Sequence, residues 1–330
     1  MQKSVFLFLV INSFFLSCST CTSLNTPEEI SVTNWNIQTF FDANNDGIEY
    51  SEFRNKNSRW DVYRYEDRLK KLCDIIEKVD SDVFVMEEVE NEKILFDISN
   101  RLSHNVWFSG KIYRFAVFSK EEGSSIGCGV ISRYEIKEIN VHSLDVKTEK
   151  EKVPSMRPIM EVTINAGSED VKMFVNHWKS KSGGDTLSEK WRKWQECILS
   201  ERMNAYKEDL VEFAVGDFNK DINSFLRNDD ERLFFTILEE ENNDVIEVYS
   251  PWDDYENEKY GTYYFRGNWE KIDHFFALEQ NTIMDFSINS FPEIINQDGS
   301  PMRYEIFNNK GYSDHLPITC RIRLKNSARG

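Results

Sequence analysis

The chain has 330 residues, of which 40% are hydrophobic and 14% aromatic, and it contains only 14 glycines and 7 prolines. This composition excludes collagen-like, low-complexity and wholly disordered proteins. With 40 basic and 57 acidic residues the formal net charge is −17, so the overall field does not attract nucleic acid or anionic lipid. A ligand that carries phosphate would need a local source of attraction, either bound metal ions or a confined basic rim.

The N-terminus has the features of an export signal. Lys3 precedes a short apolar run over residues 5–16, and small residues follow over 17–20. This run is too short to anchor the chain across a bilayer, and the pattern is typical of secretory signals. We expect residues 1–17 to be the signal.

Residues 15–18 resemble a bacterial lipobox, which predicts lipidation of Cys18 and a tether over 18–30. Ordinary cleavage nearby, which gives a soluble secreted protein, is the alternative. The expected location is therefore that of a membrane-anchored bacterial lipoprotein or of a secreted or periplasmic protein. The lipid anchor is the only membrane contact expected.

Apolar periodicity predicts alternating strands and helices from residue 31 onward. Residues that recur at three- and four-residue steps, such as Leu69, Leu72 and Ile76, indicate a helix. The helices predicted in this way cover 63–79, 91–102 and 188–206, and the strands cover 31–36, 82–86, 115–118, 128–132, 159–164, 171–176, 212–216, 261–265, 272–278 and 316–322. Interleaved strands and helices without a Pro/Gly-rich linker predict one domain over 31–325, built as an α/β sandwich of two sheets, and a tail over 326–330.

The six cysteines do not form a zinc-binding pattern. Cys18 and Cys21 lie in the signal region without a matching Cys or His pair. Cys73 and Cys197 fall in helical apolar patterns, so we expect them in the core.

Polar residues beside the apolar strand runs carry the functional signal. Acids, amides and histidines stand in six short segments, which are 34–38, 86–91, 176–180, 216–219, 271–274 and 312–317. Strands of one sheet end along common edges, so these residues are expected to converge. Carboxylate and amide oxygens with histidines suit a hard cation such as Mg²⁺ and suit phosphate hydrolysis. Each segment alone has a plainer explanation, because Asp-x-Asn after a strand is usually a capping turn and a single histidine is usually structural.

Taken in this order, the segments resemble the endonuclease/exonuclease/phosphatase superfamily, which includes deoxyribonuclease I, exonuclease III, neutral sphingomyelinases and inositol-polyphosphate 5-phosphatases. The resemblance covers residues 31–323, and its most specific marks are Gly-Asp-x-Asn at 216–219 and Ser-Asp-His-x-Pro at 313–317. Within the family it is similar to bacterial secreted nucleases. It implies a four-layer α/β sandwich with two packed mixed β-sheets flanked by helices.

The resemblance also implies a metal site. Glu88 matches the metal-ligand glutamate of the family, and Asn36 and Asp314 would complete the site. Glu87 stands where many members have Gln, and Gln38 stands where some members carry an acidic ligand. The implied cofactor is Mg²⁺, with Mn²⁺ or Ca²⁺ as alternatives.

The catalytic residues implied by the resemblance are His177, Asp217, Asn219, Asp273 and His315. Asp217 would orient or deprotonate the attacking water, and Asn219 would bond a phosphate oxygen. His315, oriented by Asp273, would stabilise charge on the phosphate. His177 would act as general acid for the departing oxygen.

Substrate contacts are expected from Arg157, which resembles a phosphate-contacting arginine of the family, and from Asn176 and Lys179 beside His177. A basic rim would include Lys179, Lys181, Lys190, Arg192 and Lys193; a solvated helix face is the alternative for these residues.

Three other features have structural explanations. Residues 42–47 begin like an EF-hand loop, but position twelve is Phe53 where a bidentate Glu is required, so we expect a polar surface loop. Trp178, Trp191 and Trp194 are expected in the core rather than stacked on bases. Strand alternation turns His274 to the face opposite Asp273.

These observations predict an exported, divalent-metal-dependent phosphodiester hydrolase that works by in-line attack of water. The expected enzyme is a nuclease that cleaves chiefly DNA, with RNA as a further substrate. A sphingomyelinase or an inositol-phosphate phosphatase is the alternative enzyme. A sphingomyelinase would need an apolar membrane-facing protrusion, for which residues 250–264 are the one candidate. A surface-binding lipoprotein without catalysis is the third hypothesis, and no obligate protein partner is expected.

Overall fold

The computed structural model describes residues 5–9, 27–104, 112–144, 154–167, 169–181, 184–205, 210–227, 231–237, 245–255 and 260–325. Cys18, Cys21, residues 10–26 of the expected signal and tether, and the expected tail 326–330 lie outside this part of the chain.

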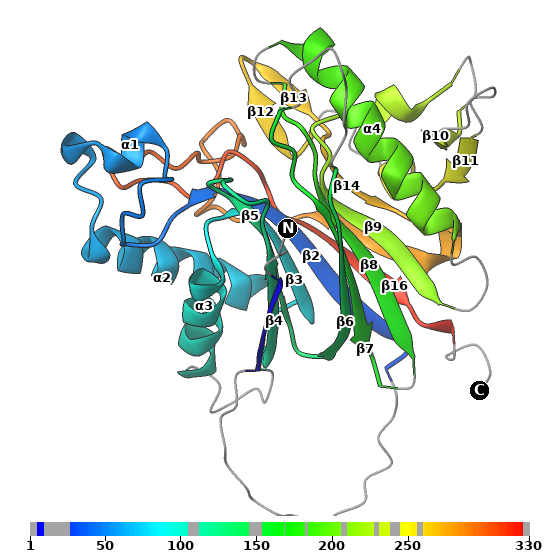
Figure 1. Cartoon of the computed structure of the whole chain (residues 1–330), viewed down its shortest axis with the longest axis horizontal. Coiled ribbons are helices and arrows are strands. Elements are labelled where there is room, and N and C mark those ends of the chain that lie inside the picture. Colours follow the sequence, from blue (N-terminus) through cyan, green and yellow to red (C-terminus); the bar gives the residue numbers. More distant parts are fainter. Residues whose placement is uncertain are drawn as a thin grey trace, which may run out of the picture.

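Two large mixed sheets face each other (Figure 1). The first sheet has the strand order β1 (Val5–Leu9), β4 (Phe115–Ser119), β5 (Gly127–Ser132), β3 (Val83–Val89), β2 (Glu29–Phe40), β16 (Ile318–Arg323) and β15 (Ile283–Ile288). The second has the order β14 (Asp273–Phe276), β9 (Val211–Asp217), β8 (Asp170–His177), β7 (Ile159–Asn165) and β6 (Glu135–His142). Only β2–β3 and β8–β9 pair in parallel, and the other neighbours in these sheets are antiparallel.

Helices cover the outer faces of both sheets (Figure 1). The helices are α1 (Ser51–Arg54), α2 (Val62–Val79), α3 (Glu92–His104) and α4 (Asp185–Asn204), and the short 3₁₀ turns are η1 (Lys56–Ser58), η2 (Ile222–Phe225) and η3 (Gln280–Thr282). Helices α2 and α3 pack on the first sheet and α4 on the second, which confirms the four-layer sandwich. Two small hairpins complete the fold, β10 (Leu233–Thr236) with β11 (Val245–Val248) and β12 (Tyr263–Phe265) with β13 (Asn268–Glu270).

The packing follows from alternation along buried strands. In β3, Val83 and Val85 lie in the core between the sheets, whereas Phe84 and Met86 pack under the helices. Helix α2 begins after Asp61, whose side chain accepts a hydrogen bond from Arg64 N at 3.0 Å and so caps the helix. Each sheet is therefore apolar on both faces, as a four-layer arrangement requires.

Every predicted helix and strand exists, with ends shifted by a few residues. The sequence analysis missed β6, β10, β11, β13 and β15, which are short, exposed or charged strands without a strong apolar run. It also missed β1, which pairs with β4 at the edge of the first sheet and falls inside the expected signal. The export signal itself stays a prediction.

Several structural expectations are confirmed and others are wrong. Cys73 and Cys197 are buried free thiols, as expected. Trp178 and Trp191 are buried, but Trp194 is 39% exposed, because it lies on the outer side of α4. The segment 42–47 is only partly a surface loop: Asp42 is buried because the side chains of Asn44 and Asn91 and the backbone of Asn44 donate to its carboxylate.

Candidate active site

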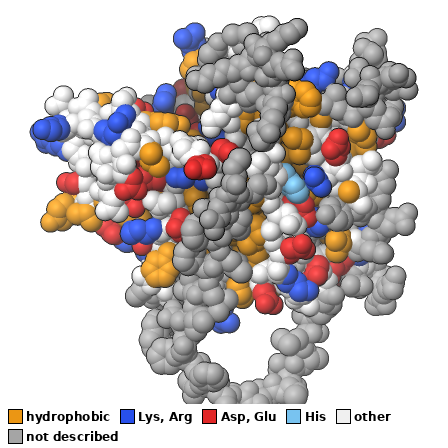
Figure 2. Space-filling model, viewed as in Figure 1, with side chains coloured by type: hydrophobic (Ala, Val, Ile, Leu, Met, Phe, Trp, Pro, Cys, Tyr) orange, Lys and Arg blue, Asp and Glu red, His pale blue; other side chains and the backbone are white. Residues whose placement is uncertain are grey.

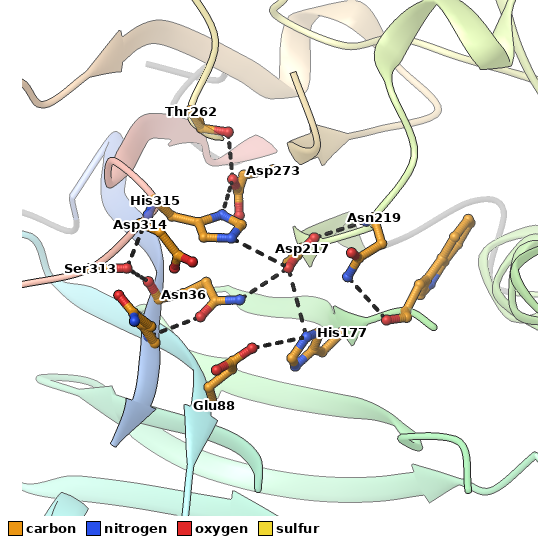
Figure 3. Close-up of polar contacts among 12 residues, drawn as sticks. Asn36, Glu88, His177, Asp217, Asn219, Thr262, Asp273, Ser313, Asp314 and His315 are labelled. Carbon is orange, nitrogen blue, oxygen red and sulfur yellow. Dashed lines mark hydrogen bonds and ion pairs between the residues drawn. The ribbon is translucent and has the colours of Figure 1, made fainter. Parts of the chain in front are cut away.

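The six polar segments converge at one edge of the sandwich, where ends of β2, β3, β8, β9 and β14 meet (Figure 3). In the second sheet Asp217 is in register with His177 on one side and with Asp273 on the other. The close-up shows the residues predicted to form the site facing one common space; they are Asn36, Glu88, His177, Asp217, Asn219, Asp273, Asp314 and His315.

Two β-bulges place the residues of the first sheet. The register of β2 with β3 shifts after Asn36, and the register of β3 with β5 shifts at Glu88. Glu88 has a φ of 65°, and Thr39 in the facing bulge has a φ of 47°. Thr39 N donates to Glu88 Oε2 at 2.6 Å, so one bulge orients the carboxylate of the other.

Asp217 is the best-connected group of the site. Its Oδ1 accepts from Asn219 N at 2.8 Å, and its Oδ2 accepts from Asn36 Nδ2 at 3.0 Å. Its Oδ2 also lies 3.7 Å from His177 Nε2 and 4.0 Å from His315 Nε2. Burial and then the carboxylate of Asp273 raise the pKa of Asp217 to about 7. The carboxylate is thus fixed in direction and strengthened as a base.

A tight turn carries Asp217 and Asn219. The preceding Gly216 has a φ of 143°, and a Cβ at this position would lie 1.9 Å from the carbonyl oxygen of Asn176. Asn219 has a φ of 49°, and its Nδ2 donates to Trp178 O at 3.2 Å. The Gly-Asp-x-Asn sequence is therefore required by backbone geometry as well as by chemistry.

The neighbours of His315 favour its protonated form. Its Nδ1 is 2.8 Å from Asp273 Oδ2, and Thr262 Oγ1 donates to the same carboxylate oxygen. Burial alone would lower the pKa of His315, but the charge and hydrogen bond of Asp273 and the charge of Asp217 raise it well above its usual value. His315 can therefore present a positive charge to a phosphate.

His177 has the opposite electrostatics. Burial and then the nearby Arg157 lower the pKa of His177 well below its usual value. This lowered pKa favours the neutral imidazole, which can donate one hydrogen bond but is a weak proton source. A bound phosphodiester would have to raise its pKa before His177 could act as the general acid that the family resemblance implies.

Glu88 and Asp314 supply carboxylates suited to a cation. Burial and then the charge of Asp314 raise the pKa of Glu88, so a cation between the two acids would relieve their repulsion. Asn36 borders them; its Oδ1 accepts from Gln38 N at 3.0 Å and retains a second lone pair. These oxygen donors fit Mg²⁺, Mn²⁺ or Ca²⁺.

A second group could also be considered for metal binding. Asp217, Asp273 and His315 each place one ligand atom within 4.8 Å of the others. Asp273 bonds His315 Nδ1 at 2.8 Å and raises the pKa of the ring, so an ion held by this group would have to compete with the proton on Nε2. We therefore interpret this group as a hydrogen-bonded charge network.

The expected substrate contacts have mixed outcomes. Arg157 lies near Glu88 and His177 and donates to Trp178 O at 3.1 Å, and Lys179 is half-buried beside it. Asn176 requires a correction: it is fully buried, its Nδ2 donates to Phe174 O at 2.7 Å, and its Oδ1 accepts from Trp178 Nε1 at 2.9 Å. Strand alternation turns it away from His177, so its side chain is not placed to contact a substrate.

The expected basic rim also needs correction. Arg192 is 1% exposed and bonds Lys179 O and Ser188 Oγ, so it is part of the interior. Lys181 pairs with Glu270 at 2.6 Å. Lys190 and Lys193 are exposed on α4.

Gln38 has a structural role, because its side chain bonds the backbone of Tyr304 at 2.9 and 3.1 Å.

The sequence analysis missed several supporting residues. Thr262 Oγ1 donates to Asp273. Ser313 Oγ donates to Asn36 O at 2.5 Å and accepts a hydrogen bond from His315 N at 3.0 Å. Such hydroxyls carry no sequence signal of their own, because serine and threonine are common near strand ends. His274 is on the opposite face, as predicted, and its Nε2 lies 2.8 Å from Lys220 O.

Glu87, beside the metal-ligand candidate Glu88, is a further buried acid of this strand. It is fully buried, and neither carboxylate oxygen has a hydrogen-bond partner among the described residues. Burial and then the charges of Asp273 and Asp217 raise the pKa of Glu87 well above its usual value. Both effects favour the protonated, neutral form of this side chain.

The whole domain matches one family. The sequence fits the model described as the Endonuclease/Exonuclease/phosphatase family over residues 31–324. The chain belongs to this family. Family members are hydrolases of phosphoester bonds that typically use divalent metal ions, which confirms the predicted class of enzyme. No curated protein matches the sequence.

Solved structures share this family's fold at low identity. TDP2 of D. rerio, complexed with a single-strand DNA product, is 13% identical over 90% of this chain and 100% of that chain, with a TM-score of 0.56. A family protein of Bacteroides thetaiotaomicron is 14% identical over 89% and 97%, with a TM-score of 0.53. The 3′ phosphatase NExo of Neisseria, bound to a product DNA hairpin, is 13% identical over 89% and 100%, with a TM-score of 0.52.

Proposed function

We propose that the chain is an exported, divalent-metal-dependent nuclease. Its main substrate is DNA, and RNA is a further substrate. The observation that carries the proposal is the buried Asp217 at one sheet edge, whose Oδ2 lies 3.7 Å from His177 Nε2 and 4.0 Å from His315 Nε2. The surroundings lower the pKa of His177 and raise the pKa of His315. Phosphodiester hydrolysis needs a base for water and positive charge for the phosphate at adjacent positions. That two similar structures hold DNA products supports a nucleic acid substrate.

The residues divide the work of an in-line displacement. Asp217 orients the attacking water and accepts its proton, because its other contacts fix the direction of the carboxylate. His315 donates to a phosphate oxygen and balances its charge, and Asp273 keeps the ring protonated. Asn219 donates to another phosphate oxygen, and His177 donates to the departing oxygen, which takes up a proton from solvent as its bond to phosphorus breaks. Glu88, Asp314 and Asn36 would hold Mg²⁺, which when bound supplies further positive charge for the phosphate.

The attraction for a polyanion is local. The net charge is −17, and Figure 2 shows acidic and basic side chains interspersed on the face drawn. Arg157 and Lys179 lie beside His177, close enough to lower its pKa. The metal and these few cations must therefore overcome the general repulsion.

The sphingomyelinase alternative has less support. In the segment 250–264, Pro251 and Trp252 are buried, and Trp252 Nε1 donates to Asp273 O at 3.0 Å. These two side chains are committed to the interior and cannot enter a membrane surface, and residues 256–259 of the segment lie outside the described part of the chain.

A side-by-side assay tests the substrate class. The purified chain is given single-stranded DNA, duplex DNA, RNA, sphingomyelin and inositol phosphates with Mg²⁺. We expect cleavage of DNA, and loss of at least about a hundredfold in kcat/KM for Asp217→Asn, in line with the size of acid–base effects. The exposed Asp285→Asn is the matched control and should keep the wild-type rate. Preference for a lipid or an inositol phosphate would reject the nuclease.

Export and lipidation at Cys18 form a separate part of the proposal. They rest on the N-terminal sequence, and among the described helices none is long and apolar enough to cross a membrane. Expression in a bacterium followed by fractionation and mass spectrometry should find a lipidated Cys18, and Cys18→Ala should release the protein from the membrane. An unprocessed N-terminus in the cytoplasmic fraction would contradict export.

A further inference from the structure

Arg68 on helix α2 is a buried cation that no role described above uses. It is only 2% exposed. Its guanidinium bonds three successive backbone carbonyls of β2: Nη2 donates to Ile37 O at 3.0 Å and to Gln38 O, and Nη1 donates to Thr39 O at 3.0 Å. A buried charge is costly unless hydrogen bonds compensate it, so these carbonyls stabilise the cation and are held by it.

Two aromatic rings pack against the guanidinium. Arg68 Cζ lies 3.7 Å from the ring centroid of Tyr304 and 4.6 Å from that of Phe40. Burial lowers the pKa of Arg68 to about 10, so the side chain is still charged at neutral pH. A stacked arginine presents its N–H donors as a rigid planar fork, which a lysine cannot do. The fork therefore sets the direction of the carbonyls that it bonds.

The bonded carbonyls belong to the bulge of β2. Strand β2 pairs with β3 as far as Asn36 and again at Phe40, so the residues between them lie outside that ladder. Gln38 and Thr39 have φ angles of 49° and 47°, in the left-handed region that residues other than glycine seldom adopt. Such a backbone persists only where its surroundings hold it. Arg68 holds this one, because it bonds the carbonyls of all three residues of the bulge.

Two peptide groups link the guanidinium to candidate metal ligands. The peptide between residues 37 and 38 accepts from Arg68 at its oxygen, and its N–H donates to Asn36 Oδ1 at 3.0 Å. The next peptide accepts from Arg68 at Gln38 O, and its N–H, that of Thr39, donates to Glu88 Oε2 at 2.6 Å. Because a peptide group is planar and trans, a bond that fixes its oxygen also fixes the direction of its N–H. Hydrogen bonds in such a chain also strengthen one another.

We propose that Arg68 is a positioning residue for the metal site. It aims two peptide N–H groups at Asn36 and Glu88, and the orientation of these ligands raises the affinity of the site for a divalent cation. The inference rests on the metal-dependent nuclease proposed above, and it adds a residue that acts only through the backbone of β2. Hydrogen-bond partners behind metal ligands typically contribute about 10–100-fold to metal affinity.

Binding of Mn²⁺ to the full chain without substrate tests this role apart from catalysis. Isothermal titration calorimetry should give a dissociation constant about tenfold higher for Arg68→Lys, which keeps the charge but not the planar fork. Arg133→Lys is the matched control and should bind Mn²⁺ as wild type does. Arg133 also bonds a backbone carbonyl, that of Asp80 at 3.0 Å, and lies 4.8 Å from the ring centroid of Tyr113, but it is next to the start of β3 and Glu88 is near its end. Urea unfolding checks that each variant is folded.

Tyr304 offers a second pair of variants that leaves Arg68 in place. Tyr304→Leu removes the ring from the guanidinium and should raise the dissociation constant of Mn²⁺ about threefold. Tyr304→Phe keeps the ring and loses only the hydroxyl bond to Asn309 Oδ1 at 2.9 Å, so it should bind as wild type does. If Arg68→Lys does not fold, this pair decides.

The outcomes separate the positioning role from the nuclease function. Weaker Mn²⁺ binding in Arg68→Lys and Tyr304→Leu but not in their controls, without DNA cleavage by wild type, would reject the nuclease and keep the role of Arg68. Wild-type affinity in the folded Arg68→Lys and Tyr304→Leu variants would overturn that role even if wild type cleaves DNA. An equal loss in Arg133→Lys, or no Mn²⁺ binding by wild type, would overturn it as well.

Discussion

The two histidines of the site differ because of their neighbours. His177 is buried near Arg157 and has a lowered pKa, whereas His315 bonds Asp273 and has a raised pKa. The sequence predicted that both histidines belong to the site, since each stands in a family-like segment. It could not predict their charges, because these depend on burial and on residues far away in the chain.

This difference predicts how His177 responds to substitution. His177→Ala should lower kcat by about a hundredfold, because a phosphate oxygen loses its donor. His177→Gln keeps an N–H donor without a titratable group, so it should recover about tenfold of that loss if His177 acts by hydrogen bonding. Steady-state rates on DNA measure both. Equal inactivity of the Ala and Gln variants would instead support proton transfer by His177.

At the scale of elements, the site depends on irregular backbone at the ends of regular strands. The sequence analysis placed the strands well, because buried strands have continuous apolar runs. It did not predict the bulges at Gln38–Thr39 and Glu88, which require positive φ in residues other than glycine. Nor did it predict that the side chain of Asn176 points away from the site, since a shift of one residue decides which face of the strand a side chain occupies.

Gly216 gives a test of this backbone. Gly216→Ala should destabilise the fold by about 3 kcal/mol or more, because its Cβ would overlap the carbonyl of Asn176 and its φ is positive. Gly184 also has a positive φ, of 115°, but a Cβ added there would meet no atom within 4 Å, so Gly184→Ala should cost only about 1 kcal/mol. Urea unfolding compares the two, and equal losses would show that close packing at Gly216 contributes nothing.

The outer face of β9 gives a pH-dependent prediction. Burial raises the pKa of Glu212 to about 7, and its Oε2 has no hydrogen-bond partner among the described residues. The ordinary pKa of a glutamate is about 4.5, and in the folded chain Glu212 has a pKa of about 7. The fold is therefore most stable with respect to this group below about pH 4.5, and this stability is lost as the pH rises through about 7.

Glu212→Gln should therefore be more stable than wild type at pH 8, by on the order of 2 kcal/mol after allowance for partial solvation, and the advantage should shrink at pH 4. Urea unfolding at both values measures it. The exposed Glu247→Gln is the control, since Glu247 pairs only at the surface with Arg232. A difference between wild type and Glu212→Gln that does not vary with pH would contradict the assignment.

At the scale of the whole molecule, an acidic chain must bind a polyanion through a small region. The sequence predicted this from the charge balance, and the structure reduces the expected basic rim, because Arg192 is buried and Lys181 is paired. Glu88 and Asp314 add negative charge at the same place. Phosphate binding at this acidic edge therefore depends on a divalent cation.

The rate of single-stranded DNA cleavage as Mg²⁺ is titrated, in wild type and in Glu88→Gln, tests this dependence most directly. We expect wild-type cleavage to rise with Mg²⁺ and to stop with chelator, and the folded Glu88→Gln variant to be slower by at least about a hundredfold. Undiminished cleavage by wild type in chelator, or a wild-type rate and Mg²⁺ dependence in Glu88→Gln, would contradict the account.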